Sequence, residues 1–523
     1  MSGFHSFGHS FGAGGGASGA SASLEELRSI LPIYPGETVK IGDTAEVRDG
    51  EIYRSLQKIG TTRAVADIGL GTVEGILGAN LVMMPLDNKR ALCFYVRYYP
   101  GSPNRYALEG FIMTDNGDSV GMTAAQLIID NANFIISMEL MELDAGKYLL
   151  TYKNTTTNKL QGTVVTVTGD TISFASTFDI STGAVNANTY LACCRMAKNK
   201  VLASYNDLVR VITFEGALAT LFPEYDHMYD SANSYIAQDR KLVAISETNA
   251  VMFYKINSNA NLPLNAKPIK INPDNTCVTS DLTKSTGYSI NSYEFQNFYG
   301  NNAVLFDGNK VAFMAKCQHV DRNRGTYVFI TEVTEDGMKI TTKMELYMGS
   351  DGSTNGGLFY VGKDTEGSFY FVSHFYANSN SYLRLLRVAK DFSSSAFEFL
   401  YTGVHLEQAT SWLVSCCLNN HRVMTLSYAG TSKRMISSLH DSRIAMPTGI
   451  ITQAVQGGAN AEIQQQGVVR ILENLIPCVE YFGNEDGKLA TIPMRSLNQT
   501  NRLNKIGVSL SPTELFIGEA IRR

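Results

Sequence analysis

The strongest constraint on the fold is a recurring unit in which a turn leads into a basic residue and then a short apolar strand. In its clearest copy, the turn Asp144–Gly146 leads into Lys147 and the alternating stretch Tyr148–Tyr152. Two further strand-like stretches follow, Thr163–Thr168 and Thr171–Phe174. Three short antiparallel strands cannot bury their apolar faces alone, so this unit requires neighbours of the same shape.

Six more copies of the unit follow one another along the chain. Their strands are Ala91–Val96, Val201–Tyr205, Leu242–Ser246, Val311–Met314, Ser368–Val372 and Val423–Tyr428. The copies lie roughly 40 to 70 residues apart, near the blade period of a β-propeller. Seven four-stranded blades around an axis would protect nearly all strand edges. We therefore predict an all-β fold with a seven-bladed β-propeller over residues 81–442.

The segments on either side of the repeats predict smaller units. The capping-box pattern Ser23–Glu26 predicts a short helix to Leu31, followed by a β-hairpin module at 34–53 and a Gly-rich connection at 55–80, so that 23–80 forms one unit. Residues 443–523 predict a separate small β-domain with hairpin turns. Inside the fourth repeat, 257–293 reads as a long polar insertion.

Residues 1–22 are rich in Gly, Ser and Ala and contain a small aromatic repeat. Such a composition is typical of a disordered tail. The alternative is a docking arm that orders in a groove of a partner. Its docking residues would be Phe4, His5, Phe7, His9 and Phe11.

Composition excludes several classes of function. A net charge of −5 argues against a dominant nucleic-acid surface, and no apolar run approaches the roughly 20 residues of a membrane span. The first residues lack a basic and apolar leader, so we expect no secretory signal. The eight cysteines show no C-x-x-C spacing and predict buried free thiols rather than a metal site.

Tyrosine-rich loop tips are the predicted receptor-facing sites, because tyrosine offers a flat apolar face and a hydroxyl. The alternative is that these rings only cover core. The candidates are Tyr98, Tyr99, Tyr106, Tyr225, Tyr229, Tyr235, Tyr376 and Tyr382.

The chain contains no G-x-S-x-G elbow, H-E-x-x-H, P-loop or EF-hand pattern. Its densest acidic cluster surrounds His227 and is read as a solvated loop. We predict no catalytic residues, no cofactor and no metal. The cluster consists of Glu215, Glu224, Asp226 and Asp230.

Two stretches resemble bacteriophage virion proteins. Val164–Phe174 resembles the propeller repeats of tail and fibre proteins, which end in Gly-Asp-Thr-Ile-Ser-Phe. The stretches Gly449–Val468, Leu475–Phe482, Asp486–Leu489 and Ile506–Leu515 resemble the small C-terminal β-module of such proteins, although Cys478 replaces the usual glycine. The resemblance implies a virion component and no particular chemistry.

The resulting expectation is a structural virion protein of the tail, fibre or baseplate. Its N-terminal arm and terminal modules would bind other virion proteins, and the propeller would bind a host-surface glycan or protein. We expect a homo-oligomer or multicopy component made in the host cytoplasm, with no nucleic acid and no membrane insertion. The alternatives are a head, collar or capsid-decoration protein, and a propeller glycan depolymerase.

Overall fold

The computed structural model describes a chain built from β-strands. The described residues are 27–34, 39–48, 50–54, 62–67, 81–99, 105–117, 119–130, 135–185, 191–206, 208–226, 237–256, 264–279, 289–290, 303–317, 325–334, 340–350, 352–363, 367–377, 380–393, 395–404, 410–419, 422–429, 434–441, 449–454, 460–470, 472–477, 479–483, 489–490 and 505–517. All regular elements in these ranges are strands. The docking-arm residues Phe4, His5, Phe7, His9 and Phe11 lie outside them.

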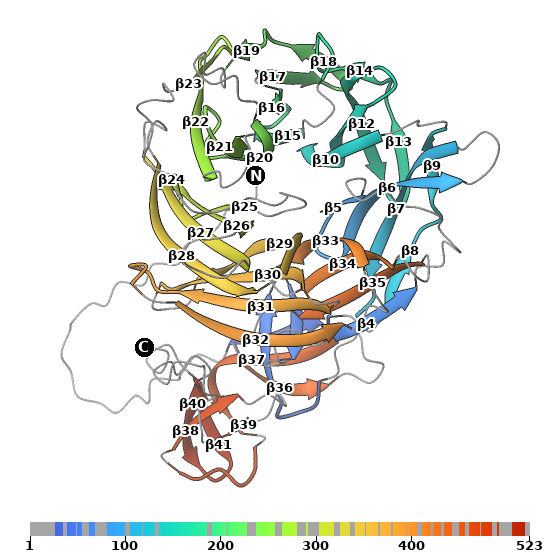
Figure 1. The fold of residues 1–523 in the computed structure, drawn as a ribbon. Helices are drawn as coiled ribbons and strands as arrows, with labels where there is room; N and C mark the ends of the chain where they lie inside the picture. Colours follow the sequence, from blue (N-terminus) through green and yellow to red (C-terminus); the bar gives the residue numbers. More distant parts are fainter. Residues whose placement is uncertain are drawn as a thin grey trace.

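Within the described residues, seven antiparallel sheets of four or five strands form the propeller (Figure 1). Blade 1 contains β5 (Leu81–Pro85), β6 (Arg90–Tyr99), β7 (Arg105–Asp115), β8 (Val120–Met122) and β9 (Gln126–Ile129). Blade 2 contains β10 (Ile135–Asp144), β11 (Lys147–Asn154), β12 (Lys159–Thr168), β13 (Thr171–Phe174) and β14 (Phe178–Asp179). Blade 3 contains β15 (Ala192–Ala197), β16 (Lys200–Tyr205), β17 (Leu208–Glu215), β18 (Leu218–Leu221) and β19 (Tyr225–Asp226).

The remaining blades follow the same up-and-down order. Blade 4 contains β20 (Ala237–Ala244), β21 (Asn249–Ile256), β22 (Leu264–Ile271), β23 (Cys277–Thr279) and β24 (Ser289–Ile290). Blade 5 contains β25 (Ala303–Phe306), β26 (Lys310–Cys317), β27 (Gly325–Val333) and β28 (Ile340–Ser350). Blade 6 contains β29 (Gly352–Lys363), β30 (Phe369–Ala377), β31 (Asn380–Val388) and β32 (Ser395–Val404). Blade 7 contains β33 (Thr410–Asn419), β34 (Arg422–Ala429), β35 (Arg434–Asp441) and β4 (Thr62–Asp67).

The ring is closed by a strand from the N-terminal part of the chain. Each blade's first strand contacts the first strand of the next blade, and β33 of blade 7 contacts β5 of blade 1. The outer strand of blade 7 is β4, with Asp67 opposite Ile436 and Ala64 opposite Leu439. The all-β propeller is therefore confirmed, but β4 lies in the segment that we read as a Gly-rich connection.

The hydrophobic core lies between the blades, because successive side chains of a strand point to opposite faces of its sheet. On β6, Cys93 packs with Cys416 in the cluster shared by blades 1 and 7, whereas Phe94 packs toward blade 2. The adjacent residues Cys193 and Cys194 of blade 3 also point to opposite faces. Cys193 packs in the core between blades 2 and 3, and Cys194 packs in the core between blades 3 and 4. In the described part of the chain six cysteines are free thiols, and five of them are buried, as predicted: Cys93, Cys193, Cys194, Cys277 and Cys416.

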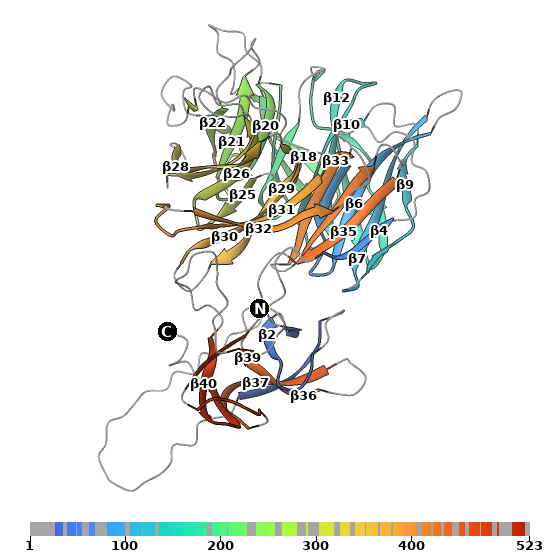
Figure 2. The same ribbon diagram turned by 60° about the horizontal axis from the view of Figure 1, so that its bottom comes forward.

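Strands from both flanking segments share one sheet, which we call the base. It contains β1 (Leu27–Pro32), β2 (Thr44–Arg48), β3 (Glu51–Arg54), β36 (Gly449–Ala454), β37 (Asn460–Val469), β38 (Glu480–Gly483), β39 (Leu489–Ala490), β40 (Lys505–Ser511) and β41 (Glu514–Ile517). Strand β37 pairs with β1, β36 and β41, and β2 pairs with β36. The base lies against one side of the ring (Figure 2).

Three sequence predictions are corrected by this arrangement. Leu27–Leu31 forms a strand instead of the predicted helix, because β37 supplies backbone partners along its whole length. The N-terminal hairpin and the C-terminal module are one sheet, not two units. The stretch 257–293 is not a loop insertion, since β22, β23 and β24 lie within it.

Candidate functional site on the face opposite the base

The direction of β6 defines two faces of the propeller. Lys89, just before β6, contacts the base through an ion pair of 2.7 Å with Glu51. The ten residues of β6 span roughly 30 Å at about 3.3 Å per residue. Tyr98 and Tyr99, at the other end of β6, therefore lie on the face away from the base.

A tyrosine cluster forms the rim of blade 1 on that face. The rings of Tyr98 and Tyr106 lie opposite one another across β6 and β7, with centroids 4.9 Å apart. The guanidinium of Arg97 lies 4.8 Å from the centroid of the Tyr99 ring. All four side chains are partly exposed. Tyr98 and Tyr106 lie on the face of the sheet toward blade 2, and Arg97 and Tyr99 lie on the opposite face, so the rim offers an aromatic pair on one side and an aromatic ring with a cation on the other.

Glu109 anchors the Arg97 and Tyr99 side of this rim. Its carboxylate is buried and accepts hydrogen bonds from the hydroxyls of Tyr95 and Tyr99, and Arg97 lies 3.8 Å away. Burial and the bond to Glu109 raise the pKa of Tyr95 well above its usual value, so its hydroxyl stays a donor. Sequence reasoning missed Glu109, because its partners precede it on another strand.

Tyr95 belongs to a repeat that the sequence reading also missed. Tyrosine stands five positions after the first residue of β6, β11, β16 and β21. These side chains are buried, and burial raises the pKa of each. A spacing count from the turns could have found them. The four residues are Tyr95, Tyr152, Tyr205 and Tyr254.

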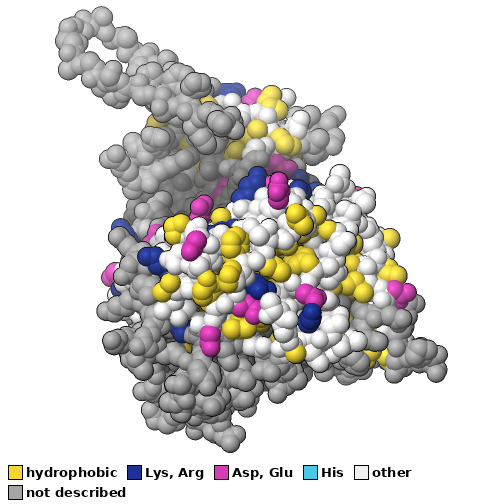
Figure 3. Space-filling view, turned by 90° about the horizontal axis from the view of Figure 1, so that it is seen from above, with side chains coloured by type: hydrophobic (Ala, Val, Ile, Leu, Met, Phe, Trp, Pro, Cys, Tyr) yellow, Lys and Arg dark blue, Asp and Glu magenta, His cyan; other side chains and the backbone are white. Residues whose placement is uncertain are grey.

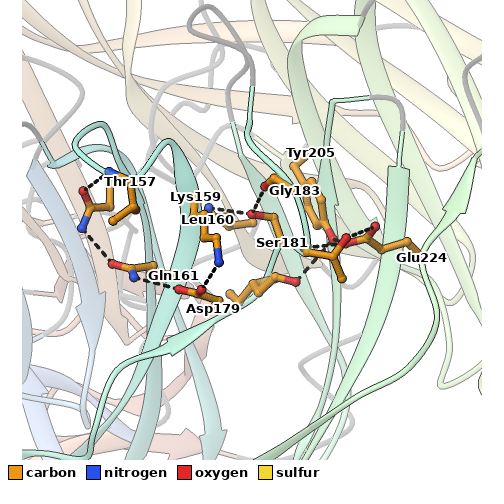
Figure 4. A network of polar contacts seen from close by, with 12 residues as sticks. Thr157, Lys159, Leu160, Gln161, Asp179, Ser181, Gly183, Tyr205 and Glu224 are labelled. Carbon is orange, nitrogen blue, oxygen red and sulfur yellow. Dashed lines mark hydrogen bonds and ion pairs between the residues drawn. The ribbon is translucent and has the colours of Figure 1, made fainter.

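Between blades 2 and 3, one such tyrosine enters a polar network (Figure 4). The Tyr205 hydroxyl donates to Glu224 Oε1 at 2.6 Å, and Thr182 donates to Glu224 through its backbone N–H (2.9 Å) and hydroxyl (2.7 Å). Arg210 Nη1 lies 3.4 Å from the same carboxylate. Asp179 continues the network on the blade 2 side, where Gln161 donates to it at 2.9 Å and Lys159 pairs with it.

Glu224 is thus a structural carboxylate that joins two blades, not part of a solvated loop as predicted, and His227 and Asp230 lie outside the described residues. Burial raises the pKa of Glu224, but the hydrogen bonds from Tyr205 and Thr182 and the charge of Arg210 outweigh it. The pKa consequently lies below its usual value. Glu215 is exposed, and Asp226 is exposed on β19.

A pH-dependent stability difference should therefore separate Glu224→Gln from the unaltered protein. A depressed folded-state pKa contributes stability above the unfolded value of about 4.3, and this is lost as the pH falls through the folded-state pKa. We expect Glu224→Gln to lower stability by about 1–3 kcal/mol at pH 7. Urea unfolding at several pH values should show the difference shrinking below about pH 4. A constant difference down to pH 3 would contradict this reading.

Charged side chains on or directly after the first strands of blades 2 to 4 pair with each other between blades. Lys241 Nζ on β20 lies 3.3 Å from Glu139 on β10. Burial raises the pKa of Glu139, and Lys241 offsets this only in part. Arg195 pairs with Glu142 at 2.8 Å and Lys198 with Asp144 at 2.9 Å. These carboxylates have cationic partners and serve to join blades.

The other predicted tyrosines are placed as follows. Tyr225 lies on β19 of blade 3, opposite Val209 of β17. Tyr376 and Tyr382 lie on β30 and β31, one register step apart. Tyr229 and Tyr235 lie outside the described residues. The structure thus brings Tyr98 and Tyr106 together, places Tyr99 on the opposite face of the same sheet beside Arg97 and Glu109, and places Tyr225 on another blade.

The outer strand of blade 3 carries two exposed leucines. Figure 3 views the molecule from the top of Figure 1, where blade 3 lies, and shows hydrophobic side chains interspersed with charged and other side chains on this side. On β18, Leu218 is 68% exposed and Leu221 37% exposed. An outer strand with exposed leucines is a surface that favours contact with another protein.

Within the described part of the chain, no helix has the length and hydropathy of a membrane span. The same residues bring together no group of three or more His, Cys, Asp or Glu side chains able to hold a metal ion.

No protein-family model and no curated protein matches the sequence. Solved β-propellers resemble the structure. The β-propeller domain of the Trilobed protease from Pyrococcus furiosus is 9% identical, with 70% of this chain and 99% of that chain covered and a TM-score of 0.37. An α-L-arabinanase from Penicillium chrysogenum is 12% identical, covers 75% and 99% of the two chains and has a TM-score of 0.36. The WD40 domain of SCAP from fission yeast is 9% identical, covers 73% and 99%, and has a TM-score of 0.35. Similarity at this level concerns the fold, so the reactions and partners of these proteins do not carry over to this chain.

Proposed function

We propose that this chain is a structural attachment protein of a bacteriophage virion. In this proposal, the base and the N-terminal segment bind other proteins of the particle, and the propeller presents its opposite face to the host surface. The tyrosine cluster of blade 1 is the proposed contact site for a surface glycan or protein. Many copies on one particle would turn weak single contacts into firm adhesion.

The observation that carries the proposal is the separation of the two ends of the molecule. The base contacts one face through Lys89 and Glu51, and Tyr98 and Tyr106 lie roughly 30 Å away at the far end of β6 and start of β7. A pair of facing tyrosines suits sugar binding, because the rings cover the apolar faces of a sugar and the hydroxyls reach its polar groups.

The carboxylates near this face favour binding over hydrolysis. Glycoside hydrolysis requires two carboxyl groups that can act on the substrate as acid and as base or nucleophile. Glu109 is engaged by two tyrosine hydroxyls, and Glu224 by Tyr205, Thr182 and Arg210. The contacts of both carboxylates hold strands together, which leaves neither carboxylate available to act on a sugar.

Binding of the full chain to an array of bacterial surface polysaccharides, and to intact bacteria, tests the proposal. Tyr98→Ala combined with Tyr106→Ala should weaken binding at least tenfold, since each lost aromatic contact costs about 1 kcal/mol or more. Tyr347→Ala is the matched control, because Tyr347 is 39% exposed and its ring lies tilted against Tyr327, with centroids 5.1 Å apart, in blade 5.

Equal binding by the double variant and the control would refute the tyrosine cluster as the contact site. If the unaltered protein binds neither array nor cells but is found in purified particles, a head or collar component without a receptor role replaces the attachment proposal. Loss of polysaccharide chain length on incubation would instead support a depolymerase.

A further inference from the structure

The base is attached to the ring at the seam where the ring closes. Strand β4 of blade 7 follows β3 of the base along the chain, and β35 of blade 7 is followed by β36 of the base. Blade 7 is thereby tied to the base through both its outer strands. Blade 1, on the other side of the seam, contacts the base through Lys89.

Tyr34, which follows β1 of the base, reaches into this seam. Tyr34 is buried, and its hydroxyl donates to Asp115 Oδ2 at the end of β7 in blade 1 at 2.6 Å. The guanidinium of Arg422, at the start of β34 in blade 7, lies 5.2 Å from the centroid of the Tyr34 ring. Lys89 Nζ lies 5.2 Å from the same centroid.

The charges under Tyr34 come from the two blades that must stay together. Arg422 Nε lies 3.5 Å from Asp115 Oδ2, and both side chains are almost fully buried. Such a pair is stable only if further hydrogen bonds satisfy its charges. Asp115 also accepts from the N–H of Gly117 at 2.7 Å, and Tyr34 supplies another donor together with an aromatic face for the cation.

The backbone of Tyr34 is fixed within the base itself. Its N–H donates to the carbonyl of Ile52 at 2.9 Å, and the neighbouring Ile33 forms a bridge to Ile52. Movement of the base away from the ring would therefore withdraw the phenol from Asp115 and Arg422 together.

We propose that the base keeps the propeller ring closed between blades 1 and 7. When Tyr34 is in place, the Asp115–Arg422 pair holds blades 1 and 7 together. When the base moves away or Tyr34 is lost, β4 and blade 7 open before any other part of the ring. This coupling gives the protein a route by which a partner that binds the base changes the ring.

Hydrogen exchange of the full chain, measured by mass spectrometry, tests whether Tyr34 keeps the ring closed. Tyr34→Ala should speed exchange at least tenfold in β4 and β34, and leave β16 and β17 of blade 3 unchanged. Tyr34→Phe keeps the ring and removes only the hydroxyl, so it should give a smaller increase at the same strands and keeps the test valid if Tyr34→Ala does not fold. Tyr205→Phe is the matched control, because Tyr205 is also buried and donates to a carboxylate at 2.6 Å. It should affect β16 and β17 and spare β4.

Thiol labelling gives a second reading of the same opening. Cys93 and Cys416 are buried in the core between blades 1 and 7, whereas Cys193 is buried between blades 2 and 3. In Tyr34→Ala, N-ethylmaleimide should modify Cys93 and Cys416 at least tenfold faster than in the unaltered protein, with Cys193 unchanged. Faster exchange confined to the base strands, or equal acceleration at β16 and β4, would overturn the proposal.

Discussion

Replacing Arg422 by methionine will lower the free energy of unfolding by about 3–5 kcal/mol, the usual cost of breaking a buried ion pair by removing one partner. The physical reason is that Asp115 stays buried while its cationic partner is lost. Methionine retains much of the aliphatic packing, so the loss reports the charge rather than a cavity. Urea unfolding followed by circular dichroism measures the change.

Arg195→Met is the control for that experiment. Arg195 pairs with Glu142 at 2.8 Å, but the two side chains are 38% and 40% exposed. An exposed pair contributes about 0–1 kcal/mol, so this variant should differ little from the unaltered protein. Equal destabilisation by the two variants would mean that burial of the Arg422–Asp115 pair is not what makes it important.

Phe313→Ala should cost about 3–5 kcal/mol, because it empties the core between blades 4 and 5. The Phe313 ring is fully buried and stacks on Phe253 at 4.1 Å and on Phe329 at 4.9 Å. The surrounding strands are held by hydrogen bonds on both sides and cannot collapse fully into the space. Thermal and urea unfolding of the full chain test this.

The exposed Tyr347 again supplies the comparison. Tyr347→Ala removes an aromatic ring from the surface of the same blade and should change stability by less than about 1 kcal/mol. A small effect of Phe313→Ala, close to that of Tyr347→Ala, would show that the blade interface repacks around the missing ring.

The repeated second strands of the blades could be predicted because their signal is local. In the turn before β26, Lys310 Nζ pairs with Asp307 Oδ2 at 3.0 Å, and before β6, Arg90 Nε pairs with Asp87 at 2.7 Å. The acidic turn and the basic residue interact within one hairpin, so the pattern appears directly in the sequence. Six of the seven predicted strands are second strands of blades: β6, β11, β16, β26, β30 and β34.

The fourth copy shows the limit of that signal. Lys241 follows a turn-like stretch but belongs to β20, the first strand of its blade, and its partner is Glu139 of blade 2. The second strand is β21, which begins at Asn249, a residue without charge. The basic residue at 241 thus serves an interblade pair, which a local pattern cannot distinguish from a turn pair.

The missed elements have their partners far away in the sequence. Strand β4 is defined by β35, and β1 by β37, so neither is stabilised by its neighbours along the chain. The capping-box pattern at Ser23–Glu26 favoured a helix, but backbone pairing outweighs local propensity. In the candidate site, Tyr98 and Tyr106 follow from their place at a hairpin end, whereas Glu109 requires knowledge of the register between β6 and β7.

The pairing of β4 with β35 has a consequence for synthesis. At a translation rate of about 5–20 residues per second, β4 leaves the ribosome roughly 20–70 s before its partner exists. Strand β1 waits even longer for β37. Throughout that time neither strand has its native partner, so the propeller ring of the nascent chain cannot close. Folding to the native structure is therefore confined to the period around release of the chain from the ribosome. Chaperones that shield unpaired strands should therefore raise the yield of this protein most when they stay bound until the end of translation.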